Sequence, residues 1–187
     1  MKAFRDKYGK DQFSQNGEDG IIKEVLRRLK IKKGVAVEFG GADGFYCSNT
    51  AALREKGWTV HMYDIKAVHP YVEEKIIGPV NVNTIPECDV LSIDVDGNDY
   101  NIWRAYDGRP KIVIIEVNSD FKPGERVLNK GTSYTPMVEL RLSKDYFLLA
   151  HTGNMIFVLN EYKDLFPEVS ADPITEAHEY FNDSWIK

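Results

Sequence analysis

The chain has few cysteines, no excess of positive charge and no long apolar run, and each of these absences excludes a class of protein. Cys47 and Cys88 are its only cysteines, and neither belongs to a C-x-x-C pair or to a Cys/His cluster. We therefore expect neither a disulfide framework nor structural zinc, and a reducing compartment fits this cysteine usage. The formal net charge of -5 argues against a nucleic-acid partner, because contact with phosphates needs a basic surface.

No window of the sequence approaches the roughly 18 consecutive apolar residues that a membrane span needs. The N-terminal stretch "MKAFRDKYGKDQF" is basic but contains no apolar segment, so we expect no signal peptide and a cytoplasmic protein. With 8 prolines and 14 glycines, the composition is that of a globular chain without repeats. A length of 187 residues favours one domain, with an N-terminal helix or lid (1–33), a core sheet (34–160) and a C-terminal tail (161–187) that is either a docked helix or a frayed end.

Hydrophobic periodicity predicts helices that alternate with strands. Helices are expected at residues 16–30, 48–57, 98–106 and 136–143, and strands at 35–39, 58–65, 89–95 and 111–117, with a hairpin at 146–160. Asn16 and Asp19 have capping-box spacing, and Ser48 or Asn49 would cap the second helix. Residues 66–87 show only a possible short helix near 71–75 and a short strand at 76–77. This order favours a doubly wound, mostly parallel α/β sheet whose closing hairpin adds one antiparallel strand.

In an open parallel sheet, ligands bind beyond the carboxyl ends of the strands, where "VEFGGADG" places Glu38, Gly40 and Gly44. A dinucleotide fingerprint does not fit this stretch, because Ala42 and Phe45 occupy its second and third glycine positions. Glycines allow a ligand to approach the backbone closely, and a carboxylate at the strand end can receive an ammonium group. Twenty residues after Gly44, Asp64 ends the second strand and is placed to accept hydrogen bonds from ribose hydroxyls. Alternatively, the glycines only make a tight turn and Asp64 is a solvated loop acid.

Six stretches together resemble the FkbM-type branch of the class I S-adenosylmethionine-dependent methyltransferases, over residues 12–160. They are "FSQNGEDGII", "VEFGGADGFYCSNTAALREKGW", "LSIDVDGNDYNIW", "IIEVN", "GTSY" and "HTGNMIFV". The resemblance implies a Rossmann-like, seven-stranded sheet in the order 3-2-1-4-5-7-6. It also implies transfer of a methyl group from S-adenosyl-L-methionine, usually to a hydroxyl oxygen of a sugar or natural product. The expected partner is thus a small-molecule or glycan acceptor.

The same resemblance implies which residues bind the cofactor. They are Gln15, Glu38, Gly40, Gly41, Asp43, Gly44, Asn49, Asp64 and Asp94. Ser14 and Gln15 match an N-terminal S-Q signature, which has two readings: a lid over the cofactor, or a cap at the entry of the first long helix. The stretch between Asp64 and Asp89 is shorter than in relatives, which leaves the third strand unplaced.

The stretch "LSIDVDGNDY" contains Asp94, Asp96 and Asp99 and looks at first like a calcium loop. The twelve-residue pattern fails, because a start at Asp94 puts Asp99 where Gly is needed and Ala105 where the bidentate Glu must be. Methyl transfer needs alignment of the acceptor and, for a hydroxyl, removal of a proton. If the strand continues, Asp94 and Asp96 point the same way and converge with Glu116 of the neighbouring strand. We expect these three acids to be the catalytic groups, as base or as orienting groups for the acceptor.

Three other interpretations of the site remain open. The same acids, with Asn118, suit Mg²⁺ held by oxygen ligands. Alternatively, Asp99 caps the following helix, Asp96 and Gly97 form a turn, and only Asp94 lies near the cofactor. Finally, the fold can serve as a non-catalytic cofactor-binding or accessory module. Further candidates for the wall of an acceptor pocket, or for turn chemistry, are Thr132, Ser133, Tyr134, His151 and Asn154.

Overall fold

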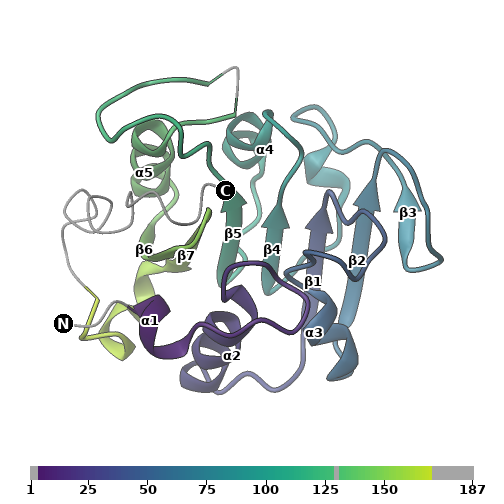
Figure 1. Cartoon of the computed structure of the whole chain (residues 1–187), viewed down its shortest axis with the longest axis horizontal. Coiled ribbons are helices and arrows are strands. Elements are labelled where there is room, and N and C mark those ends of the chain that lie inside the picture. The colour runs from purple at the N-terminus through teal and green to yellow at the C-terminus, as the bar shows by residue number, and fades with distance from the viewer. Residues whose placement is uncertain (1–3, 129–130, 170–187) are drawn as a thin grey trace.

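The protein forms one seven-stranded sheet between two layers of helices, as Figure 1 shows for the computed structural model. The structure describes residues 4–128 and 131–169; most of the predicted C-terminal tail therefore lies outside the described residues. The strands are β1 (Val35–Phe39), β2 (Thr59–Asp64), β3 (Val72–Glu74), β4 (Val90–Ile93), β5 (Ile112–Glu116), β6 (Tyr146–His151) and β7 (Asn154–Leu159).

The sheet has the order β3-β2-β1-β4-β5-β7-β6, which confirms the predicted order. Strands β1 to β5 pair in parallel, whereas β7 runs antiparallel to both β5 and β6. The carboxyl ends of β1, β2, β4 and β5 therefore meet at one edge of the sheet. Ligands bind at this edge in open sheets of this kind.

The helices cover both faces of the sheet because residues on both faces of its strands are apolar. On one face, Val37 and Phe39 pack with α4 (Asp99–Ala105) and α5 (Tyr134–Ser143). On the other face, Ala36 packs with α2 (Glu18–Arg28). The same layer includes α1 (Phe4–Tyr8) and α3 (Ala51–Glu55). Burial on both faces explains why the central strands read as nearly continuous apolar runs. No helix within the described ranges has both the length and the apolar character to cross a membrane.

Residues 66–87 differ from the sequence prediction. Residues 71–75 are not helical: they contain β3, which pairs in parallel with β2 through Met62 and Val72, and the strand expected at 76–77 is absent. Val72 is buried against Met62 and Ala51, while Glu73 and Glu74 are exposed. Pairing at the sheet edge decides the conformation here, because so short a segment has little intrinsic preference. Hydrophobic periodicity did not predict α1 or the short 3₁₀ helices at Val82–Thr84 and Asn160–Leu165.

The entry to α2 is built differently from the predicted capping box. The N-cap residue is Gly17 (φ 98°), with no side-chain cap. Instead, the Asp19 carboxylate accepts hydrogen bonds from the backbone N–H groups of Gln12, Phe13 and Ser14, at 2.7–2.9 Å. The Ser14 hydroxyl in turn accepts one from the N–H of Asp19 at 3.0 Å. Ser14 thus has the helix-entry role, and the segment before α2 is fixed to the first turn of the helix.

Glu18 connects the segment before α2 to the turn between β6 and β7. Its side chain is fully buried and accepts hydrogen bonds from the Thr152 hydroxyl (2.5 Å) and the Asn154 side-chain amide (3.2 Å), at the turn between β6 and β7. Its other oxygen accepts the N–H of Asn16 at 2.8 Å. A buried carboxylate needs such donors, because desolvation without them is costly. Residues far apart in sequence are thereby held beside each other.

We expect Glu18→Ala to lower the free energy of unfolding by roughly 2–4 kcal/mol, because the buried Thr152 hydroxyl and two partly buried donors lose their acceptor. Urea denaturation followed by circular dichroism measures this loss. The matched control is Glu139→Ala, which removes an exposed ion pair with Arg126 and should change stability little. Equal losses in the two variants would contradict the buried role of Glu18.

Candidate functional site

The glycine loop after β1 approaches the end of β4 so closely that no side chain fits between them. Gly40 has φ 76°, and a Cβ atom at this position would lie 1.7 Å from the main-chain oxygen of Asp94. Gly44 has φ 77°, and its N–H donates to the carbonyl of Gly41 at 2.6 Å. Left-handed backbone and close approach are the two conditions that require glycine. The loop is therefore a tight turn and brings β1 and β4 together at the carboxyl edge.

Glu38 fixes the segment that follows the glycine loop through hydrogen bonds, and it lines neither of the two cavities described below. Its carboxylate is buried and accepts hydrogen bonds from the hydroxyls of Ser48 (2.6 Å) and Thr50 (2.6 Å) and from the N–H of Asn49 (2.8 Å). Burial raises its pKa. The Asn49 amide donates to the Ser92 hydroxyl at 3.0 Å. In this structure Glu38 and Asn49 close the loop onto the start of α3, and their contact with a cofactor stays a prediction.

The N-cap residue of α3 is Thr50, with no side-chain cap, so neither Ser48 nor Asn49 occupies the predicted cap position. The Ser48 hydroxyl accepts hydrogen bonds from the N–H groups of Ala51 (2.9 Å) and Thr50 (3.2 Å) at the start of the helix. Asp43 has a comparable local role, since its carboxylate accepts the N–H groups of Phe45 and Tyr46. Both residues shape the loop that carries the glycines.

A cavity of about 250 Å³ lies between the glycine loop and the ends of β2 and β4. Its wall combines apolar side chains with one acid at the end of β2 and two acids after β4: Phe39, Gly40, Tyr63, Asp64, Ile65, Lys75, Ile76, Ile77, Asp94, Val95, Asp96 and Asn98. The Asp64 carboxylate accepts the N–H of Ala42 at 2.9 Å, so it also ties β2 to the glycine loop. At the mouth, Ile65 and Ile76 are 75% and 70% exposed, which leaves apolar surface for a ligand to cover.

A second, larger cavity of about 470 Å³ opens at the carboxyl ends of β4 and β5. It is lined almost wholly by polar residues: Gln15, Asn16, Asp94, Asp96, Glu116, Val117, Asn118, Ser119, Asp120, Gly131, Gly153 and Asn154. Asp94 and Asp96 line both cavities, so the two spaces meet at these acids. The sequence interpretation did not assign Asn16, Ser119 or Asp120 to the site. The available signals are the position of Asn16 next to Gln15 and the position of Ser119 and Asp120 shortly after β5.

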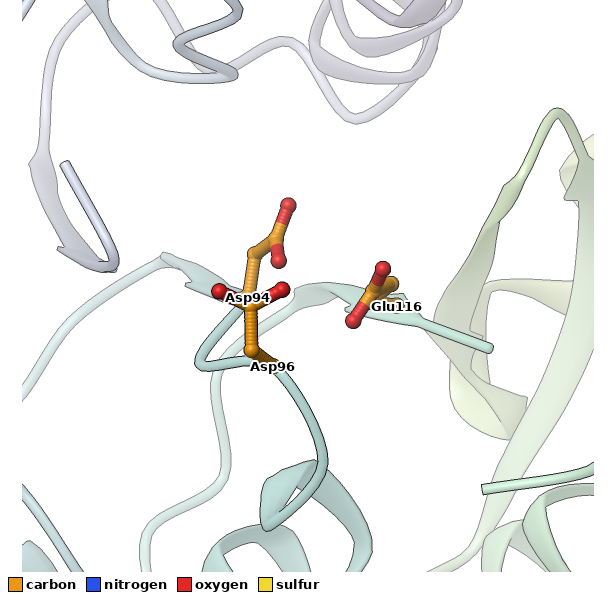
Figure 2. A group of neighbouring side chains, drawn as sticks. All are labelled: Asp94, Asp96 and Glu116. Carbon is orange, nitrogen blue, oxygen red and sulfur yellow. The ribbon is translucent and has the colours of Figure 1, made fainter. Parts of the chain in front are cut away.

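Three carboxylates converge in the larger cavity, as Figure 2 shows. One oxygen from each of Asp94, Asp96 and Glu116 lies within 4.8 Å of the others. The predicted convergence of the three acids is thus observed, but the backbone conformation that produces it differs from the continued strand that the sequence suggested. Strand β4 ends at Ile93, and Asp96 adopts φ 54°, so a turn and not a continued strand brings Asp96 back toward Asp94.

The turn depends on Asp99, which is not the helix cap that the sequence suggested. The N-cap of α4 is Asn98, and the Asp99 carboxylate instead accepts the N–H groups of Val95 (2.8 Å) and Gly97 (3.0 Å). The predicted turn at Asp96 and Gly97 is therefore present, together with the convergence of the acids.

The environment of Asp94 and of Glu116 favours their protonated forms. Desolvation, followed by the negative charges of Asp99 and Asp96, raises the pKa of Asp94 to about 7. Desolvation and the charge of Asp94 raise the pKa of Glu116 to about 8. Near neutral pH the group can hold a proton, accept one from a ligand, or bind a hard cation through its oxygens.

The remaining candidates divide between the cavity wall and the core. Asn154 lines the larger cavity, whereas His151 is buried against the Tyr134 ring (centroids 5.8 Å apart), and burial lowers its pKa to about 3. Ser133 donates to the carbonyl of Glu125 at 2.8 Å, which is turn chemistry. Gln15 lines the larger cavity, and its amide contacts the thiol of Cys47 in the glycine loop. Among the expected cofactor residues, Gly41, Asp43 and Gly44 line neither cavity.

No protein-family model and no curated protein sequence matches the chain. Its structure is similar to that of CalO1, a methyltransferase of calicheamicin biosynthesis solved with bound S-adenosylhomocysteine, at 12% identity and a TM-score of 0.42. That match covers 74% of this chain and 54% of the other. A candidate S-adenosyl-L-methionine-dependent methyltransferase from Methanococcus maripaludis matches at 10% identity and a TM-score of 0.40, over 80% of this chain and 94% of the other. Similarities this distant carry no information about activity.

We expect Glu116→Gln to stabilise the protein at pH 8.5 and to have little effect at pH 5. The raised pKa means that the folded state binds more protons than the unfolded state between about pH 4.5 and 8, so stability falls as the pH rises through this range. After allowance for screening by water, removal of the repulsion should gain about 1 kcal/mol at pH 8.5, or roughly 2–4 °C in melting temperature. Thermal unfolding at both pH values tests this. The exposed Glu73→Gln is the control, and the same shift at both pH values would contradict the assignment.

Proposed function

We propose that the protein is an S-adenosyl-L-methionine-dependent methyltransferase that methylates a hydroxyl group of a sugar-like or other small acceptor. One observation carries this proposal: two cavities of different character meet at Asp94 and Asp96, on the carboxyl edge of the sheet. A two-substrate transfer needs this arrangement, in which each substrate has its own space and the reacting atoms meet at the junction.

The smaller cavity suits the nucleoside part of the cofactor. Asp64 is placed to accept hydrogen bonds from ribose hydroxyls, and the apolar side chains of Ile65, Ile77 and Val95 offer a surface for a purine ring. Gly40 allows the ligand to lie against the backbone at the junction with β4. In this assignment Glu38, Asp43 and Asn49 support the loop from behind.

The larger cavity suits an acceptor rich in hydroxyl groups. Its side-chain amides offer donors and acceptors, and its carboxylates accept hydrogen bonds from hydroxyls. Among the described residues that line it there is no Lys, Arg or His, so these residues offer a phosphorylated or carboxylated acceptor no cationic partner. The polar wall therefore supports an uncharged polyol more than an anion.

The carboxylates have the chemistry that such a transfer requires. Bound S-adenosyl-L-methionine would supply an electrophilic methyl group for an in-line displacement by the acceptor hydroxyl. Asp94 lies where the two cavities join, and its deprotonated carboxylate can take the proton that the hydroxyl loses as the new O–CH₃ bond forms. Asp96 and Glu116 would orient the acceptor. In a variant of this mechanism, Asp94, Asp96 and Glu116 would hold Mg²⁺, and the bound ion would supply Lewis acidity toward the acceptor hydroxyl.

The wild-type protein should bind S-adenosylhomocysteine, measured by isothermal titration calorimetry. Gly40→Val should abolish binding, because its side chain would occupy the contact with Asp94. Asp64→Ala should raise the Kd by roughly 10- to 100-fold, through loss of hydrogen bonds to a charged acceptor. The control is Glu161→Ala, on the 3₁₀ helix that follows β7. Absence of heat with both S-adenosylhomocysteine and S-adenosyl-L-methionine would refute the proposed function.

The rate of methyl transfer should rise with pH up to about 7 and level off above it, because the Asp94 carboxyl must lose its proton before it can act as a base. Radioactive methyl transfer to a panel of monosaccharides measures the profile, and Asp94→Asn should lower kcat by about 10²- to 10⁴-fold. Assays with EDTA and with added Mg²⁺ distinguish a bare carboxylate from a metal site. Cofactor binding without transfer to any acceptor would favour the accessory module instead.

A further inference from the structure

Asp99 is a buried acid at the site that the proposed mechanism does not use. Its side chain is 1% exposed, and it lines neither of the two cavities. A residue at the start of α4 could act simply through the helix dipole, for which an exposed acid is sufficient. The Asp99 carboxylate instead turns back along the chain to the N–H groups of Val95 and Gly97.

The backbone that these two hydrogen bonds close has an unfavourable conformation. Asp96 has φ 54° and Gly97 has φ 119°, so two successive residues lie on the left-handed side of the Ramachandran plot. A non-glycine residue enters this region only where its surroundings compensate for the strain. Val95 and Gly97 flank Asp96, so the compensation acts on both sides of the strained residue.

Asp94 and Asp96 differ in what holds them. The backbone of Asp94 is fixed by the sheet, since its N–H donates to the carbonyl of Phe39 at 3.2 Å and its carbonyl packs against Gly40. Asp96 lies beyond the last strand residue, Ile93, and the N–H groups on either side of it donate to Asp99. The position of the Asp96 carboxylate relative to Asp94 and Glu116 therefore depends on Asp99.

We propose that Asp99 is a positioning residue that holds the 94–98 turn and so keeps Asp96 in the group of carboxylates with Asp94 and Glu116. This inference rests on the proposed function for its consequence: because Val95, Asp96 and Asn98 also line the smaller cavity, release of the turn weakens cofactor binding as well as acceptor placement. The acceptor oxygens of Asp99 set the conformation of the turn, and Asp99 itself touches neither substrate.

The test compares Asp99→Ala and Asp99→Asn with Ile102→Ala. Ile102 is a suitable control because it lies on the same helix and is buried, but its aliphatic side chain accepts no hydrogen bond from the turn. Amide hydrogen exchange of Val95 and Gly97 is measured by NMR, and the Kd for S-adenosylhomocysteine is measured by calorimetry. Asp99→Ala should speed exchange of both amides and raise the Kd by at least about tenfold, the loss expected for a charge-assisted hydrogen bond. Asp99→Asn keeps one acceptor oxygen and should restore part of both values.

Ile102→Ala should lower the melting temperature while it leaves exchange at Val95 and Gly97 and the Kd close to wild type. Unchanged exchange of both amides in Asp99→Ala would overturn the proposal. The proposal would also be overturned if Ile102→Ala raised the Kd as much as Asp99→Ala does while the two variants have similar melting temperatures. If Asp99→Ala does not fold, Asp99→Asn alone carries the comparison. If the wild type does not bind S-adenosylhomocysteine, the proposed function fails, and amide exchange still decides whether Asp99 holds the turn.

Discussion

The close contact between Gly40 and the main-chain carbonyl of Asp94 is the constraint on which the rest of the site depends. It fixes the glycine loop of β1 against the end of β4, so that a loop from one strand and an acid from the next share one space. Glu38 holds the loop from below through the hydroxyls of Ser48 and Thr50, and Asp64 holds it from the side through Ala42. Buried acceptors of this kind fix a loop because each donor would otherwise lose its partner.

Acids in this protein divide into two kinds by what surrounds them. Glu18, Asp19, Glu38 and Asp99 each accept hydrogen bonds from backbone, hydroxyl or amide donors, and they determine where segments distant in sequence lie. Asp94 and Glu116 instead face a cavity beside other carboxylates. The first kind stabilises the fold, and the second kind is available for proton transfer or for binding a ligand.

The prediction from sequence succeeded where one physical signal dominated. Continuous apolar runs identified the central strands, and the alternation of strands and helices favoured a doubly wound sheet, because strands covered on both faces must be apolar throughout. The resemblance supplied the strand order, which the structure has. The prediction failed for residues 71–75, whose three-residue strand is stabilised by pairing with β2. It also did not foresee the hydrogen bonds of Glu38, because Ser48 and Thr50 lie beyond the glycine loop.

The sequence by itself determined the layers of the protein and the edge of the sheet near which Asp94, Asp96 and Glu116 lie. Periodicity and strand ends are local properties, and parallel strands place their carboxyl ends together. Only the tertiary structure decided which acids face a cavity and which are buried among donors, since these roles depend on contacts between segments. The roles of Asp96 and Asp99 follow from the 94–98 turn, in which Asp96 has φ 54° and Gly97 has φ 119°. Hydrophobic periodicity does not predict such a turn.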